Sequence, residues 1–168
     1  LCTVVEPSRV STPKRSYGFT ISQPQDNLPI IGIIDTGISS LTPLKSILLN
    51  DSVFDLTASG SDTDNANHGT GVAALAAMGK MPYALNYRGE FTSDARLLSI
   101  KVMDASSSNL KPSEVIKILK EVNRRYPEIK IFVLTIGSEM HKRNNEDHSI
   151  YAAELDRFSY ENDCLIFI

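Results

Sequence analysis

The chain has 168 residues, of which 42% are hydrophobic and 22% charged, and its formal net charge is −3. This length suits one domain with a real core, and the slight acidity argues against a nucleic-acid partner, which usually leaves a basic surface. The apolar runs are shorter than the roughly 18 residues that a membrane-spanning helix needs, so we expect no membrane partner.

The first half of the chain opens with a polar segment and then becomes regular. Residues 1–28 are polar and interrupted by prolines, and we interpret them as an irregular lead-in or linker. Residues 29–35 are a nearly continuous β-branched run, which is typical of a strand buried on both faces of a parallel sheet. A short helix is expected over 41–49, a polar loop over 50–67 and an Ala-rich helix over 68–79.

The second half continues the same alternation. After a loop over 80–95, apolar residues predict a buried strand over 97–102. Residues 112–126 have apolar positions at helical spacing, with a proline in the first turn and another directly after the last residue. The remaining elements are a strand over 129–136, a charged loop over 138–148, a helix over 149–160 and a strand over 164–168.

Strands that alternate with helices favour an α/β fold. We expect three layers, α/β/α, around a mainly parallel sheet with right-handed crossovers. In such sheets the ligand crevice lies beyond the carboxyl ends of the strands, where the sequence places Asp35 and Gly137. The sequence stops within the apolar run 164–168, so the fold is expected to be incomplete at its C-terminus.

Two short motifs carry residues suited to nucleophilic catalysis. Ile-Ile-Asp-Thr-Gly places Asp35 at the end of a strand, and His68-Gly69-Thr70 opens the Ala-rich helix. A serine hydrolase needs a hydroxyl that attacks, an imidazole that takes its proton and a carboxylate that fixes the tautomer of the imidazole. His68 is therefore the candidate base and Asp35 the candidate carboxylate.

The residues beside these two are suited to unusual backbone conformations. Gly37 can adopt a positive φ and turn the chain sharply after the strand. Asn67, directly before His68, is among the few non-glycine residues that tolerate a left-handed conformation. Gly69 leaves room beside the histidine, so the two motifs are expected to pack closely.

With these motifs the sequence resembles the subtilisin-like serine proteases, the subtilases. The boxes at 35–37 and 68–70 match two of the three motifs of that family, in the family's order. The segment 133–137, Val-Leu-Thr-Ile-Gly, is similar to the family segment whose backbone pairs with substrate. The resemblance implies that Thr135, Ile136 and Gly137 bind a peptide or protein substrate, and that residues 29–168 are the N-terminal part of a subtilase-like catalytic domain.

The sequence also departs from the family pattern. The family's third box, Gly-Thr-Ser-x-Ala, and the Gly-Asn of its oxyanion hole are absent from the chain. In the family both follow a strand similar to 164–168, so the resemblance implies that the remaining C-terminal part of the catalytic domain is a partner and that this chain alone is inactive. Residues 81–87 do not match the calcium loop of secreted members. We therefore expect no calcium, no other metal and no cofactor.

The sequence gives only a slight indication of source and location. The details of the histidine box, such as Gly71 where a second histidine is common, are similar to a bacterial subgroup found within larger multidomain proteins. No secretion signal is visible, which slightly favours the bacterial cytoplasm and leaves secretion open.

Other interpretations stay open at this point. Aspartic proteases use a similar Asp-Thr-Gly box, in which two aspartates share a proton, although the His-Gly-Thr box has no role there and the helices contradict an all-β fold. A subtilase-like domain that holds peptides at a strand edge without cleaving them is a further alternative. Asp62 and Asp64 could hold a cation, but a hydrated loop is the favoured interpretation.

Overall fold

The structure is a computed structural model, and it describes residues 18–22, 27–49, 51, 53–57, 59–79, 88–105, 110–136 and 149–168. Its centre is a four-stranded sheet with the strand order β4-β2-β5-β6, in which every neighbouring pair is parallel. The strands are β2 (Ile30–Asp35), β4 (Arg96–Lys101), β5 (Ile131–Leu134) and β6 (Leu165–Phe167).

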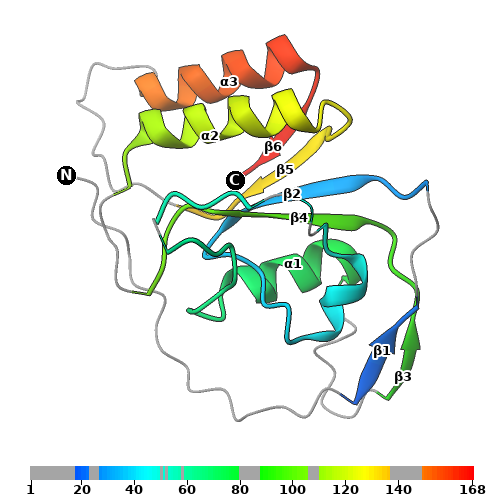
Figure 1. Cartoon of the computed structure of the whole chain (residues 1–168). Helices are drawn as coiled ribbons and strands as arrows, with labels where there is room; N and C mark the ends of the chain where they lie inside the picture. The colour runs from blue at the N-terminus through cyan, green and yellow to red at the C-terminus, as the bar shows by residue number, and fades with distance from the viewer. Residues whose placement is uncertain are drawn as a thin grey trace.

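Helices cover both faces of this sheet, as Figure 1 shows. Helix α1 (Gly69–Met78) contacts β2 and β4 on one face. Helices α2 (Pro112–Arg125) and α3 (Ile150–Asn162) pack against each other on the opposite face. This arrangement confirms the predicted three-layer α/β/α fold with a parallel sheet.

The register of the strands brings three strand ends to one edge of the sheet. Asp35, the last residue of β2, pairs with Lys101, the last residue of β4. Ile34 pairs with Leu134, the last residue of β5. The residues directly after β2, β4 and β5 therefore lie at the same rim of the sheet. Parallel sheets form their ligand crevice at this rim.

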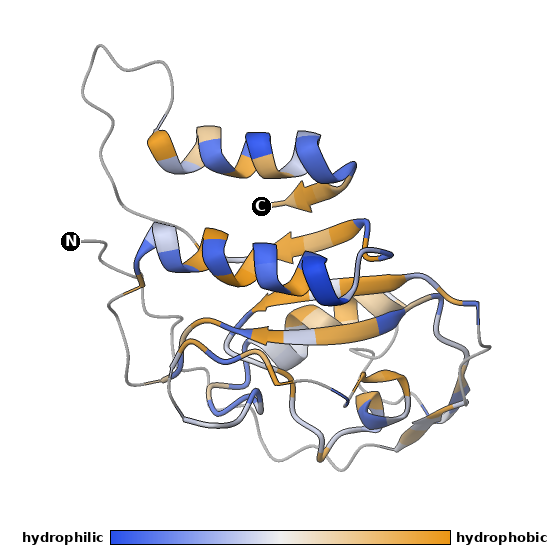
Figure 2. Cartoon of the chain, turned by 45° about the horizontal axis from the view of Figure 1, so that its top comes forward, coloured by the Kyte–Doolittle hydropathy of each residue, from blue (hydrophilic) through white to orange (hydrophobic). Residues whose placement is uncertain are grey.

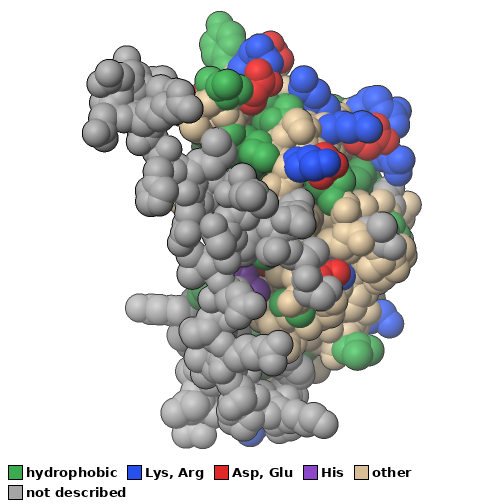
Figure 3. Space-filling model, turned by 90° about the vertical axis from the view of Figure 1, so that its left-hand side faces the viewer, with side chains coloured by type: hydrophobic (Ala, Val, Ile, Leu, Met, Phe, Trp, Pro, Cys, Tyr) green, Lys and Arg blue, Asp and Glu red, His purple; other side chains and the backbone are tan. Residues whose placement is uncertain are grey.

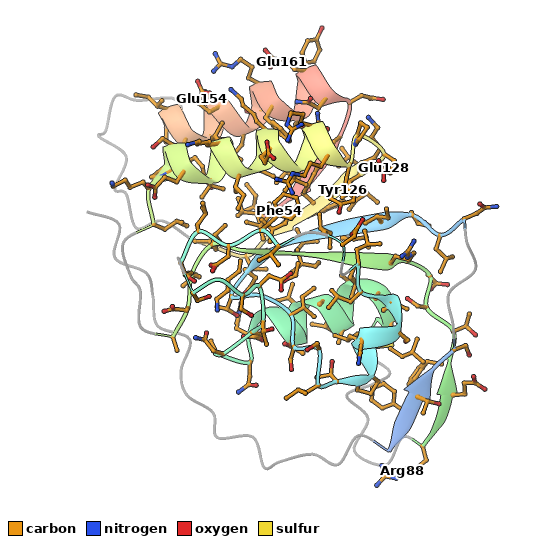
Figure 4. All side chains as sticks on the ribbon, in the orientation of Figure 1. Phe54, Arg88, Tyr126, Glu128, Glu154 and Glu161 are labelled. Carbon is orange, nitrogen blue, oxygen red and sulfur yellow. The ribbon has the colours of Figure 1, made fainter. Side chains whose placement is uncertain are left out.

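Each face of the sheet has its own apolar core, and Figure 2 shows the strands as predominantly hydrophobic. Ile33 is fully buried on the α1 side, where the small residues Ala73 and Ala77 allow the helix to approach closely. On the other side, Phe54 and Tyr126, labelled in Figure 4, lie close together. Their rings meet edge to face with centroids 6.0 Å apart. Burial on both faces explains why the strands are apolar runs without alternation.

Three short elements differ from the sequence-based expectations. The helix expected over 41–49 is a 3₁₀ helix, η1 (Pro43–Ile47). Strands β1 (Phe19–Ile21) and β3 (Gly89–Phe91) form a separate parallel two-stranded sheet, in segments that we predicted to be irregular. The prediction was wrong there because strands of this length carry too few residues to show a periodic pattern.

Two further predictions concern segments that the structure does not describe. The loop over 81–87, for which no calcium was expected, and the charged loop over 138–148 both lie outside the described residues. Within the described part of the chain, no helix has the length and apolar character that crossing a bilayer requires.

Candidate active site

The two motifs meet at the rim of the sheet because the backbone turns sharply beside each of them. After β2, Gly37 adopts a φ of 98°. A Cβ at this position would lie 2.2 Å from the carbonyl oxygen of Asp62, so only glycine fits. Before α1, Asn67 has a φ of 61°, which places His68 at the N-cap of the helix. Both backbone expectations from the sequence are confirmed.

The side chains of Asp35 and His68 are joined by a hydrogen bond. The Nδ1 atom of His68 lies 2.8 Å from Oδ1 and 2.9 Å from Oδ2 of Asp35. The Asp35 side chain is only 1% exposed, whereas that of His68 is 40% exposed. Histidine surface is visible in purple in Figure 3. The carboxylate is therefore held inside the fold, while the imidazole reaches solvent.

This geometry assigns the proton of a neutral His68 ring to Nδ1. A carboxylate can only accept hydrogen bonds, so Nδ1 is the donor and Nε2 keeps its free lone pair. An imidazole in this tautomer can take a proton from a hydroxyl placed against Nε2. The pair can therefore serve as the base and orienting carboxylate of a nucleophilic site.

Two further donors fix the carboxylate of Asp35. The backbone N–H of Thr36 donates to Oδ1 at 2.6 Å. The hydroxyl of Thr135, directly after β5, donates to Oδ2. Donors from two neighbouring strand ends, together with His68, therefore leave Asp35 little freedom to rotate.

The backbone around the pair is tightly packed. A Cβ on Gly69 would lie 2.3 Å from the carbonyl oxygen of Gly37 and 3.0 Å from the Cβ of Asp35. The expectation that Gly69 leaves room beside the histidine is confirmed. This contact brings the first turn of α1 directly against the end of β2.

The segment predicted to bind substrate is only partly described. Thr135 is exposed, and Ile136 is half-buried against the core on the α2 side. Gly137 lies outside the described residues. The structure gives Thr135 a contact that the sequence analysis missed, since its side chain bonds to Asp35 as well as lying at the proposed substrate edge.

The sequence analysis also missed residues at the end of β4 that hold the backbone around the site. Lys101 is 2% exposed, and its Nζ donates to the carbonyl oxygen of Thr63 at 3.0 Å. The neighbouring N–H of Val102 donates to the carbonyl oxygen of Asp35 at 2.9 Å. A lysine at the last position of a buried strand was the available signal, because such a side chain is rarely buried without a partner.

Of the two aspartates considered as cation ligands, Asp64 is already occupied by hydrogen bonds within the protein. The carboxylate of Asp64 is buried and accepts hydrogen bonds from protein groups, among them the hydroxyl of Thr70 at 2.6 Å. Burial raises the pKa of Asp62 above its ordinary value. Among the residues that the structure describes, no group of three or more His, Cys, Asp or Glu side chains is placed to hold a metal ion.

Comparison with protein families agrees with this geometry. A family model described as Subtilase family matches residues 26–168, which include both motifs and the whole central sheet. The chain belongs to the subtilase family. Subtilases are serine peptidases, and the α/β fold with a parallel sheet is the one expected for the family. A search of curated proteins found no match.

Proposed function

We propose that this subtilase chain supplies the Asp and the His of an Asp-His-Ser triad in a serine endopeptidase. His68 is the general base, and Asp35 fixes its tautomer and stabilises the imidazolium that forms during turnover. The observation that carries the proposal is the bond from His68 Nδ1 to the buried Asp35 carboxylate at 2.8 Å, with the histidine itself partly exposed.

The nucleophile is proposed to come from a further polypeptide segment. The chain contains neither Gly-Thr-Ser-x-Ala nor the Gly-Asn of the oxyanion hole. In the assembled site, the serine Oγ attacks the peptide carbonyl carbon while His68 Nε2 takes its proton and passes it to the leaving amine as the C–N bond breaks. Water, deprotonated by His68, then cleaves the acyl-serine ester, and the proton returns to the serine Oγ. Without that segment, the chain is proposed to bind its partner segment but to hydrolyse nothing.

The substrate is proposed to be a peptide or protein that runs along Thr135, Ile136 and Gly137. An extended peptide can hydrogen-bond to an exposed strand end, which gives affinity through the main chain. Thr135 is exposed directly after β5, next to the Asp35–His68 pair, so a peptide bond held there is near the base. The proposal includes no nucleic acid, membrane, metal or cofactor.

The serine mechanism is preferred to an aspartic one. An aspartic site needs two carboxylates that share a proton. Asp35 is instead bonded to an imidazole, and it closes a strand of a parallel sheet between helices. The His68 contact has a function in the serine mechanism and none in the aspartic one.

The test uses the complete protein that contains this chain and the segment with the serine. We expect cleavage of a fluorogenic peptide and covalent labelling by a fluorophosphonate, with pepstatin without effect. His68→Ala should lower kcat by roughly 10⁴-fold or more, because the base is lost. Glu121→Gln, on the exposed surface of α2, is the control and should retain full activity.

Two results would contradict the proposal. Peptide binding by the complete protein without cleavage would identify a non-catalytic binding module. Peptide hydrolysis by the 168-residue chain alone that disappears in His68→Ala would show that the nucleophile lies within this chain.

A further inference from the structure

Helix α1 begins without a capping side chain of its own. His68 occupies the N-cap position, and its side chain makes no hydrogen bond to the first turn of the helix. Its ring is bound to Asp35 instead. The N–H groups of a first helical turn have no partner within the helix, so other groups must accept from them.

Asp64, in the preceding loop, accepts from one of these N–H groups and also binds the backbone just before His68. Its side chain is buried, with 8% exposed. Oδ2 accepts from the backbone N–H of Thr70 at 2.9 Å and from its hydroxyl at 2.6 Å. Oδ1 accepts from the backbone N–H groups of Ala66 and Asn67, each at 2.9 Å. One carboxylate therefore holds the backbone on both sides of His68.

Thr36 connects the same carboxylate to Asp35. The hydroxyl of Thr36 donates to Oδ1 of Asp64 at 2.8 Å and accepts from the N–H of Gly69 at 3.0 Å. Its N–H donates to the carboxylate of Asp35 at 2.6 Å. The Asp64 network thus contacts the chain directly beside both members of the Asp35–His68 pair.

We propose that Asp64 is a positioning residue that holds the His68 ring against Asp35. His68 lies between two backbone segments that Asp64 fixes, so a shift of either segment changes the distance and angle from Nδ1 to the carboxylate. A shift of about 1 Å is already costly in a preorganised catalytic site. That His68 acts as a base rests on the proposed function, but the orientation of its ring does not.

The test reads the His68 ring directly in the 168-residue chain. Nitrogen-15 NMR, at a pH where imidazoles are neutral, reports how the ring proton divides between Nδ1 and Nε2, and His68→Ala assigns the signals. Asp64→Asn keeps the size of the side chain but replaces one acceptor oxygen with a donor, which opposes the donors around it. We expect the ratio of the Nδ1–H to the Nε2–H tautomer to fall about tenfold.

Asp55→Asn is the matched control. The Asp55 carboxylate lies in the same polar loop and also accepts several hydrogen bonds, but from Thr57, Ser59 and Ser61. This variant should lose stability in urea without a change in the tautomer ratio. If Asp64→Asn behaves in the same way, Asp64 is a structural cap only and the proposal is overturned.

A second variant covers the case in which Asp64→Asn does not fold. Thr70→Val removes one donor to Asp64 and should lower the tautomer ratio in the same direction, by about two- to fivefold. A folded Thr70→Val chain with an unchanged ratio would also overturn the proposal.

Kinetics of the complete protein separate this inference from the proposed function. Asp64→Asn should lower kcat about tenfold and leave KM unchanged, since the buried Asp64 side chain is not open to substrate. If the complete protein cleaves no peptide, while Asp64→Asn still shifts the tautomer ratio, the proposed function fails and the positioning role stands.

Discussion

Gly69 at the start of α1 lies directly against Gly37, the residue that turns the chain after β2. A Cβ on Gly69 would come within 2.3 Å of the carbonyl oxygen of Gly37. The neighbour is backbone, and it belongs to a turn whose φ of 98° only glycine adopts easily. This close approach is what allows the strand carrying Asp35 and the helix carrying His68 to share one site.

Gly69→Ala is therefore expected to destabilise the fold by about 1–3 kcal/mol, the usual cost of overpacking. The gain in helix propensity, about 1 kcal/mol, acts in the opposite direction and is smaller than the steric cost. The free energy of unfolding in urea is the measurement. Gly60→Ala is the control, because nothing lies within 4 Å of its Cβ position and only its positive φ is strained. If Gly69→Ala is as stable as the parent chain, the packing argument is wrong.

Thr135→Val tests whether the hydroxyl of Thr135 supports Asp35 or contacts substrate. The variant keeps the shape of the side chain and removes the donor to Oδ2 of Asp35. In the complete protein we expect kcat to fall about tenfold with KM unchanged, because a hydrogen bond to a charged group is lost. Thr135→Ser retains the hydroxyl and should keep the activity. A higher KM with an unchanged kcat would assign the side chain to substrate binding instead.

The parts of the site that the sequence predicted are those set by local chain geometry. Asp35 follows an apolar run, and the positive φ values of Gly37 and Asn67 were expected from residue type alone. His68 opens a helix whose small residues mark a close approach to the sheet. These features depend on neighbours in sequence, so a single chain is enough to infer them.

The parts that could not be predicted depend on which strands are neighbours in space. Thr135 reaches Asp35 only because β5 lies beside β2, although β4 comes between them in the sequence. The pairing of β1 with β3 is likewise set by tertiary contacts, since three-residue strands have no pattern of their own. Asp64 looked like a solvated loop residue because its partners lie in two other segments.

Glu121 on α2 is expected to titrate at unusually low pH. Hydrogen bonds from Arg124 first, and then from Arg125, lower its pKa from 4.5 to about 2. The folded pKa lies below the unfolded one, so the stabilising effect is complete above about pH 4.5 and is lost as the pH falls towards 2. The group is exposed, so the effect should be small and should weaken in high salt.

Carboxyl carbon-13 NMR of Glu121 checks the pKa directly. In urea unfolding, Glu121→Gln should cost stability at neutral pH, and the difference from the parent chain should shrink as the pH falls towards 2. Glu114→Gln is the control on the same helix, because the Nζ of its ion-pair partner, Lys111, is 3.9 Å away. A Glu121 carboxyl with an ordinary pKa would show that Arg124 and Arg125 do not form these hydrogen bonds to it in solution.

Cys164, between α3 and β6, is expected to react slowly in the folded chain. Its side chain is 6% exposed, and burial raises the pKa of its thiol above the ordinary 9.0. Reaction needs the thiolate, so both local opening and deprotonation must precede alkylation. In a Cys2→Ser chain, where Cys164 is the remaining thiol, iodoacetamide at pH 8 should react at least about tenfold more slowly in buffer than in urea. Equal rates in the two conditions would mean that the turn between α3 and β6 is open in the native chain.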